Sequence, residues 1–318
     1  MEMLCIRLRH PRTLAILSRT ASGIAFLALA ALTLAMRKGI ILPAVKTGFY
    51  CGDASLRYPI KEETAASKSL LFGGLVLIFV QLALTEWFGK SRGSGVKEVA
   101  SKLDSEKDSG AKRRSVSAAI TATFKGFYYA LFGLCATVFM TELGKRYAGV
   151  LRPNFLAVCQ PDVDCAAEDP LKFHEDYVCR GNDQASRKSF PSGHAAFIAY
   201  LAVFIAYHAH LRPLPSFPLM THAVSVAAAS VAWVTGLSRL TDYIHHPGDI
   251  VAGYLLGGFV AVWVLRTCFA TAAASEVTGE KNEAGNECDV RSEEGASGHH
   301  QVKLHLSPRN CLVKTSEE

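Results

Sequence analysis

Six long apolar stretches constrain this chain more than any other feature of its sequence. They occur at residues 21–36, 69–88, 119–141, 195–211, 219–237 and 250–274. Each approaches the roughly 20 apolar residues that an α-helix needs to cross a bilayer. A buried helix of a soluble protein can mimic one such stretch, but six of them separated by polar loops argue against a soluble domain. Because lipid offers no partner for free backbone groups, the sequence predicts an all-α, polytopic membrane protein with a bundle of six transmembrane helices.

The first apolar stretch also allows a second interpretation. Arg7, Arg9, Arg12 and Arg19 precede the run "IAFLALAALTLA", and this order of charged and apolar residues is that of a cleavable signal peptide. Cleavage would leave five helices and would place the two termini on opposite sides of the membrane.

Polar stretches define the rest of the organisation. Residues 89–116 are rich in Lys, Ser and Gly and predict a solvated loop, whereas the residues after 275 lack a face that could be buried. We therefore expect a cytosolic N-terminal segment (1–20), one membrane domain (21–274) and a disordered cytosolic tail (275–318). The net charge of +6 comes partly from the basic loop and suits an anionic lipid surface.

The cysteines indicate which side of the membrane is oxidising. Of the nine cysteines, Cys51, Cys159, Cys165 and Cys179 fall in the first and third loops, which share one side of a six-helix bundle. Disulfides persist outside the cell or in an organelle lumen, so we expect these loops to face such a compartment. Four free thiols are the alternative, and the pairing stays open.

The first candidate site is the segment "KRYAGVLRP". Lys145 and Arg152 are seven residues apart, which puts them two turns along one helix face before Pro153 ends the helix. Arg presents a planar fork of donors to phosphate oxygens, and Lys supplies a compact charge. Alternatively, both side chains simply reach the membrane interface from a helix end.

The second candidate site is "SFPSGHAAF". Ser192 and Gly193 stand directly before an apolar helix, where backbone amides and the helix dipole bind anions. His194 follows, and a histidine beside a phosphate ester can protonate the leaving alkoxide. A neutral histidine that caps a membrane helix is the alternative.

The third candidate site is "SRLTDYIHHPGDI", which places titratable groups against the end of a membrane helix. Polar groups at such a position are costly and usually functional. Arg239 ends one apolar stretch, and Asp249 lies four residues after His245. The carboxylate can therefore fix the tautomer of the imidazole and leave its other nitrogen free to attack. Asp249 as a simple cap of the next helix is the alternative, and these considerations do not distinguish His245 from His246.

Together the three segments resemble the type 2 phosphatidic acid phosphatase superfamily. Its motifs K-x6-R-P, P-S-G-H and S-R-x5-H-x3-D occur in order at residues 145–153, 191–194 and 238–249. The six-helix plan and the stretches "GFYCGDASLRYPIKEET", "VCRGND" and "SFPSGH" are similar to the lipid phosphate phosphatases in particular. The resemblance covers roughly residues 20 to 270.

The resemblance implies a role for each motif residue. His245 would attack phosphorus, Asp249 would orient His245, and His194 would protonate the leaving oxygen. The phosphate would be held by five residues, namely Lys145, Arg152, Ser192, Gly193 and Arg239. A phosphohistidine would form and be released by water, with no metal and no cofactor.

These expectations describe a Mg-independent membrane phosphatase with its active site at one membrane surface. Its substrates would be lipid phosphate monoesters such as phosphatidic acid, lysophosphatidic acid, sphingosine-1-phosphate or ceramide-1-phosphate. A phosphatase of isoprenoid or soluble phosphates and a non-catalytic lipid-binding membrane protein are the alternatives. We expect the plasma membrane with an extracellular site, or an endomembrane with a luminal one. The bilayer and the lipid substrates are the expected partners, nucleic acid is not, and a homo-oligomer stays open.

Overall fold

The computed structural model describes residues 11–64, 67–98, 108–212 and 218–269. Its long helices are α2 (Pro11–Arg37), α3 (Ser67–Glu98), α4 (Asp108–Ala148), α7 (Gly193–Leu211), α8 (Pro218–Thr241) and α9 (Pro247–Val264). A π-helical turn, η2 (Leu265–Phe269), continues α9. Within the described ranges, six helices are long and apolar enough to cross a membrane. The predicted all-α bundle of six spans is therefore confirmed.

Several helices extend beyond the apolar stretches that predict them. The chain is still helical up to Glu98 and is helical again from Asp108, so the prediction of a loop over the whole of residues 89–116 is wrong at both ends. An apolar stretch marks only the part of a helix that crosses lipid, and a helix can continue beyond it through polar residues. Helix α2 begins at Pro11, because proline is tolerated in a first turn. The predicted tail, 275–318, lies outside the described residues.

Helix α7 is the centre of the bundle. It packs against α8 and α9, and it also contacts α3 and α4. Glycine makes the close approach to α9 possible, because a Cβ on Gly257 would lie 1.9 Å from the carbonyl oxygen of Ala196. Tyr200, which is fully buried, donates its hydroxyl to the carbonyl of Ala130 on α4 at 2.7 Å. The helices that carry the second and third motifs are thus held against each other.

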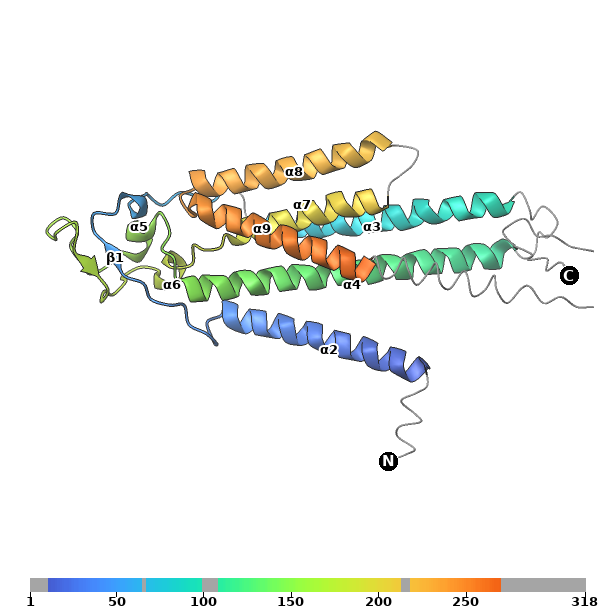
Figure 1. The fold of residues 1–318 in the computed structure, drawn as a ribbon, viewed down its shortest axis with the longest axis horizontal. Helices are drawn as coiled ribbons and strands as arrows, with labels where there is room; N and C mark the ends of the chain where they lie inside the picture. The colour runs from blue at the N-terminus through green and yellow to red at the C-terminus, as the bar shows by residue number, and fades with distance from the viewer. Residues whose placement is uncertain (1–10, 65–66, 99–107, 213–217, 270–318) are drawn as a thin grey trace, which may run out of the picture. The chain divides into compact units, whose positions relative to one another are not determined.

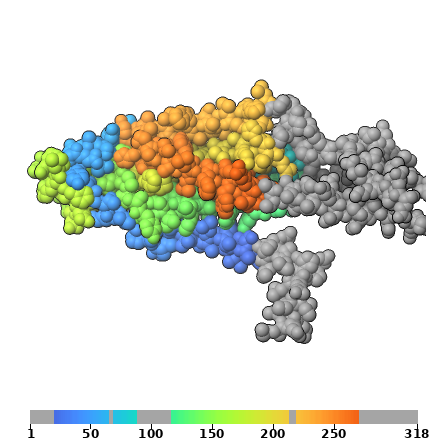
Figure 2. All heavy atoms as spheres, in the orientation of Figure 1, coloured from blue at the N-terminus to red at the C-terminus, as the bar shows by residue number. Residues whose placement is uncertain are grey.

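Small elements gather at one end of the bundle. They are β1 (Phe49–Tyr50), η1 (Ala54–Leu56), α5 (Phe155–Cys159), β2 (Phe173–His174) and α6 (Asp183–Ser186). Strand β1 pairs antiparallel with β2, with Phe49 opposite His174. Figure 1 shows these elements at the end where α4 and α8 finish and α7 and α9 begin. In Figure 2 the first and third loops, blue and yellow-green, cover this end.

Two disulfides fasten the loops at this end. Cys51 pairs with Cys165 and so joins the first loop to the third, while Cys159 pairs with Cys179 within the third loop. All four clustered cysteines are thus in disulfide bonds, as their positions suggested, and the alternative of four free thiols is wrong. Phe155, fully buried, packs beneath them. The segment that follows α4 and carries Arg152 is held by this cross-linked layer.

Candidate active site

The three motifs meet where four helices have their ends. Lys145 lies in the last turn of α4 and Arg239 in the last turn of α8. His194 lies in the first turn of α7, and Asp249 lies in the first turn of α9. Lys145, Arg152, Arg239 and His245 are all close enough to His194 to act on it electrostatically. The structure therefore brings the motif residues together from distant parts of the sequence.

His245 and Asp249 form the buried pair of the site. Both residues are 3% exposed, and Nδ1 of His245 lies 3.6 Å from Oδ2 of Asp249. This separation is too long for a hydrogen bond, and Nδ1 has no hydrogen-bond partner among the described residues, so the contact with the carboxylate is electrostatic. Burial lowers the pKa of His245 to about 4, although the Asp249 carboxylate opposes the shift. The imidazole is therefore neutral near pH 7, and with Nδ1 turned to the carboxylate, Nε2 carries the free lone pair.

Asp249 is itself fixed by two further donors. Oδ2 accepts a hydrogen bond from the hydroxyl of Ser189 at 2.5 Å and from the backbone amide of His246 at 2.9 Å. Ser189 is fully buried and was not among the residues that the sequence singled out. It lies three positions before Ser192 in "KSFPSGH", so only its place beside the motif could have drawn attention to it. Its contact holds the carboxylate that orients His245.

The neighbouring His246 has different surroundings. It is the N-cap residue of α9, and its Nε2 lies 3.1 Å from the carbonyl oxygen of Leu151. Its ring thus contacts the backbone beside Arg152, whereas the ring of His245 faces Asp249. The geometry separates the two histidines, which the residues alone could not do.

Arg239 is fully buried, and two of its three nitrogens are engaged. Nη2 lies 2.9 Å from Oδ2 of Asp242, and Nε and Nη2 donate to the hydroxyl of Ser238 at 3.2 and 3.1 Å. Among the described residues, Nη1 has no hydrogen-bond partner. Asp242, which the sequence analysis did not identify, accepts from the amide and the hydroxyl of Thr64 at 2.9 and 2.6 Å. The guanidinium is held in one orientation, and Nη1, which lies 3.5 Å from the Glu63 carboxylate without a hydrogen bond to it, can donate to a phosphate anion.

Arg152 and Lys145 complete the cationic side. The backbone amide of Arg152 donates to the carbonyl of Ser186 at 2.9 Å, which fixes the chain there. Burial lowers the pKa of Arg152, but a guanidinium stays charged at any physiological pH. Its Nε is buried and lacks a hydrogen-bond partner in the part of the chain that the structure describes. A Cβ on Gly193 would lie 3.2 Å from Nζ of Lys145, so glycine lets this ammonium reach the first turn of α7.

Ser192 occupies the N-cap of α7, as the anion-site prediction requires, but its amide is already used. That amide donates to the backbone carbonyl of Asp249 at 2.9 Å, and the hydroxyl oxygen accepts from the amide of Ala195 at 3.4 Å. Ser192 can therefore offer an anion its hydroxyl proton but not its amide. The first-turn position of Gly193 keeps its amide at the end of the helix, where a phosphate oxygen can bind.

A carboxylate from the first loop also reaches the site. Oε2 of Glu63 lies 3.5 Å from Nη1 of Arg239 and 3.8 Å from Nε2 of His194. Nothing in the three motifs points to this residue; its only sequence signal is the stretch "YPIKEET". Within the described residues, no group of three or more His, Cys, Asp or Glu side chains is arranged to hold a metal ion. The charges of the site suit a phosphate anion.

The helical bundle defines a membrane protein, and at one end of it a buried His–Asp pair lies in a cationic setting. Residues 126–272 match the family model described as PAP2 superfamily. The chain is 31% identical over 233 residues to mouse phospholipid phosphatase 1, covering 68% of this chain and 73% of the relative. It is 34% identical over 231 residues to human phospholipid phosphatase 2, covering 70% and 73%.

A crystal structure of a PAP2-type phosphatidylglycerolphosphate phosphatase from Bacillus subtilis is 19% identical to the chain. It covers 62% of this chain and 92% of its own, and the TM-score of 0.32 is too low to compare geometry in detail. The two phospholipid phosphatases are similar over most of their own length. The chain therefore belongs to the phospholipid phosphatases of the PAP2 superfamily and is an integral membrane protein.

Proposed function

We propose that the chain hydrolyses lipid phosphate monoesters by transferring the phosphoryl group to His245 and then to water. One observation carries this proposal: a neutral, buried imidazole faces Asp249 through one nitrogen, and the buried Arg239 and the partly buried Lys145 and Arg152 lie near the two histidines. A nucleophile held by an orienting carboxylate is the arrangement that covalent catalysis needs. Phosphatidic acid, lysophosphatidic acid, sphingosine-1-phosphate and ceramide-1-phosphate are the proposed substrates.

In the first half of the reaction, Nε2 of His245 attacks phosphorus. A P–N bond forms, the P–O ester bond breaks, and a proton from His194 passes to the departing oxygen, so that the lipid leaves as an alcohol. Arg152, Arg239 and Lys145 stabilise the charge on the phosphoryl oxygens. Asp249 stabilises the proton that stays on Nδ1 of the phosphorylated ring.

In the second half, a water molecule attacks the phosphohistidine. His194, which has given up its proton, takes one from this water as the P–N bond breaks, and inorganic phosphate leaves. Both histidines return to their starting protonation states. Lys145, Arg152 and Arg239 would stabilise the negative charge of the phosphoryl group in place of a metal ion. The proposed reaction therefore needs no Mg²⁺.

The disulfide-linked loops support an orientation for the enzyme. The site lies at the same end of the bundle as Cys51–Cys165 and Cys159–Cys179. Disulfides form in oxidising compartments, so we place this end outside the cell or in an organelle lumen. The bilayer, which also supplies the substrate, is the proposed partner.

Phosphate release by the purified protein tests the proposed function. The substrates are the four lipid monoesters, an isoprenoid phosphate and a soluble phosphate ester, each with the His245→Ala variant as the control. We expect release from the lipid monoesters by the native protein and none by the variant. Preference for the isoprenoid or soluble ester would contradict the proposed substrate class, and inactivity of the native protein on all of them would contradict catalysis itself.

A further inference from the structure

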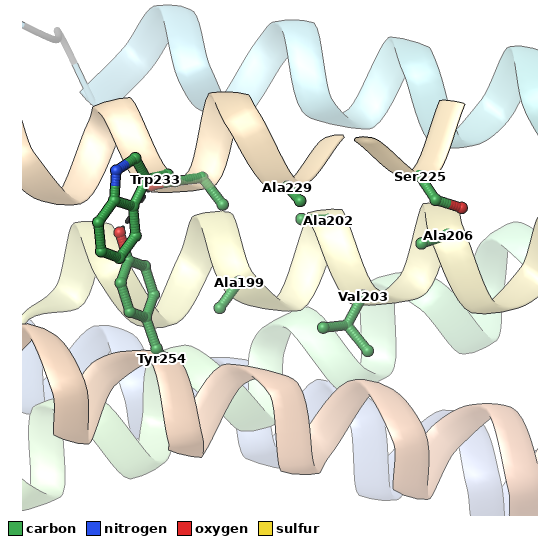
Figure 3. A pocket seen from close by; sticks show the side chains of 9 residues that line it. Ala199, Ala202, Val203, Ala206, Ser225, Ala229, Trp233 and Tyr254 are labelled. Atoms are coloured by element: carbon green, nitrogen blue, oxygen red, sulfur yellow. Dashed lines mark hydrogen bonds between the residues drawn. The ribbon is translucent and has the colours of Figure 1, made fainter. Parts of the chain in front are cut away.

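An open groove lies on the membrane-spanning part of the bundle, with the exposed Ala229 and Trp233 at its rim. It has a volume of about 300 Å³ and lies between α7, α8 and α9 (Figure 3). Its lining residues are Ala199, Ala202, Val203, Ala206, Ser225, Ala229, Ala232, Trp233 and Tyr254. Figure 3 shows Ala202 and Ala229 pointing toward each other across the gap, with Trp233 beside Tyr254 at one end. Small side chains on facing helices create this space, which we name the α7–α8 crevice.

The lining of the crevice suits a hydrocarbon. None of the nine lining side chains is charged. The hydroxyl of Ser225 donates to the carbonyl of Thr221 at 2.8 Å, and that of Tyr254 donates to the carbonyl of Ala232 at 2.7 Å. Both hydroxyl groups are thus satisfied by the helices, and an apolar chain in the crevice would leave neither unpaired.

The crevice lies deeper along the same three helices than the candidate active site. Ala199 comes five residues after His194 on α7, Trp233 six residues before Arg239 on α8, and Tyr254 five residues after Asp249. At 1.5 Å per residue, the crevice begins about 8 Å deeper than the phosphate-binding residues. It continues for about another 10 Å, to Ala206. A lipid whose phosphate lies at the helix ends extends its chain in this direction.

We propose that the α7–α8 crevice binds an acyl chain of the lipid phosphate during turnover. This inference rests on the proposed function, because only a lipid substrate has a chain to place there. The crevice would let the enzyme distinguish lipid monoesters by their chains, while the charged residues recognise the phosphate that all of them share.

Filling the crevice tests this proposal. Ala229→Leu adds bulk to an exposed alanine that lines it, and Ala227→Leu adds the same bulk to an exposed alanine of α8 that does not. We expect Ala229→Leu to lower kcat/KM for a long-chain phosphatidic acid by about tenfold, because the added bulk would occupy the space of the chain and overpacking typically costs that factor or more. Hydrolysis of p-nitrophenyl phosphate, which has no chain, should change little in either variant.

Unchanged long-chain hydrolysis in Ala229→Leu would overturn the proposal. So would an equal loss on both substrates, because it would indicate damage to the bundle, or an equal effect of Ala227→Leu. The native protein separates this failure from that of the proposed function: if it hydrolyses p-nitrophenyl phosphate and lipid monoesters, catalysis stands whether or not the crevice binds a chain.

A second, independent observation concerns the first loop, whose residues 58–64 are fastened over the end of α8. The ring of Tyr58 stacks on that of Tyr243 with centroids 4.5 Å apart. Nζ of Lys61 donates to the carbonyl of Thr241 at 3.1 Å and lies 4.3 Å from the Tyr243 ring centroid. Together with the hydrogen bonds from Thr64 to Asp242, these contacts hold residues 58–64 in place. They therefore fix the position of Glu63, which lies between Lys61 and Thr64.

Glu63 lies where it can influence the proton of His194. The imidazole is surrounded by Lys145, Arg152 and Arg239, with His245 as a further neighbour. These positive charges disfavour the protonated ring that an acid catalyst needs. The Glu63 carboxylate, 3.8 Å from Nε2, is a negative charge beside the ring that would oppose their effect.

We infer that Glu63 is a positioning residue for the general acid His194, so that the site holds two His–carboxylate pairs. His245–Asp249 serves the attack, and His194–Glu63 serves the departure of the alcohol. This inference also rests on the proposed function.

The leaving group tests the role of Glu63. An alkoxide needs a proton to depart, whereas p-nitrophenolate does not, and kcat/KM reports the step in which the leaving group departs. We expect Glu63→Gln to lower kcat/KM for an alkyl lipid phosphate at least tenfold more than for p-nitrophenyl phosphate, since general acid catalysis contributes about 10²-fold or more. The alkaline limb of the alkyl profile should also move to lower pH.

Glu62→Gln, which changes the adjacent exposed carboxylate, is the matched control and should leave the ratio between the two substrates unchanged. Equal losses on both substrates in Glu63→Gln would mean that Glu63 only shapes the loop, and gains on both would mean that it competes with phosphate. Either result would overturn the inference. Hydrolysis of p-nitrophenyl phosphate and lipid monoesters by the native protein again separates such a failure from failure of the proposed function.

Discussion

At the scale of single residues, two adjacent histidines acquire different environments from the backbone around them. The sequence "IHHPG" offers no physical reason to choose between His245 and His246. The start of α9 separates them, because its first turn aims the His245 ring and the His246 amide at Asp249. Residues such as Ser189 and Glu63 could not be predicted, since their contacts depend on elements that are distant in the sequence.

The buried environment of His245 predicts an enzyme that stays active in mild acid. In the proposed mechanism the neutral ring is the nucleophile, and burial lowers its pKa from an ordinary value of 6.5 to about 4. As pH falls, kcat/KM should therefore hold through pH 6 and fall only as the pH approaches about 4, once the ionisation of the substrate is corrected for. A pH profile on a short-chain substrate measures this. An acid limb near pH 6.5 after correction would show that the His245 pKa is not lowered.

The cations of the site predict activity without metal. Lys145, Arg152 and Arg239 supply the positive charge that Mg²⁺ provides in other phosphoryl-transfer sites. Phosphate release should therefore be the same in excess EDTA as in added Mg²⁺. A loss of activity in EDTA that Mg²⁺ restores would contradict the metal-free mechanism.

At the scale of elements, the membrane helices were predictable and their ends were not. Lipid imposes length and apolarity on residues inside the bilayer, so all six spans could be found from composition. Outside the bilayer that constraint ends, and α3 and α4 continue as helices through polar sequence. The short elements of the loops, such as β1 and β2, depend on tertiary packing and disulfides, which the sequence could suggest only as clustered cysteines.

The bond between Cys51 and Cys165 should contribute measurably to stability. It joins residues 114 apart in sequence, and removing such a cross-link typically costs about 2–4 kcal/mol. The double variant Cys51→Ser/Cys165→Ser should inactivate at a lower temperature than the native protein. Replacing Cys135 and Cys268, which are free thiols in the part of the chain that the structure describes, with Ser is the control and should have a smaller effect. Equal thermal inactivation of the disulfide variant and the native protein would exclude a stabilising role for this bond.

At the scale of the whole molecule, helix parity links the site to one side of the membrane. With six spans, the third and fifth loops share a side, which lets the residues after α4, before α7 and between α8 and α9 meet. An impermeant label applied to intact cells that carry the protein at their surface should reach a tag in the loop at 159–179. It should not reach a tag in the segment at 99–107. The reverse pattern would put catalysis in the cytosol.

Capture of the phosphoenzyme tests the central claim most directly. The native protein, mixed rapidly with a lipid monoester carrying labelled phosphate and then denatured in alkali, should retain label in an acid-labile form. His245→Gln should retain none and should lose several orders of magnitude in turnover, as expected when a covalent nucleophile is removed. His246→Ala should still form the phosphoenzyme and release phosphate. Label that persists in His245→Gln, or that disappears only in His246→Ala, would contradict the assignment of His245 as the nucleophile.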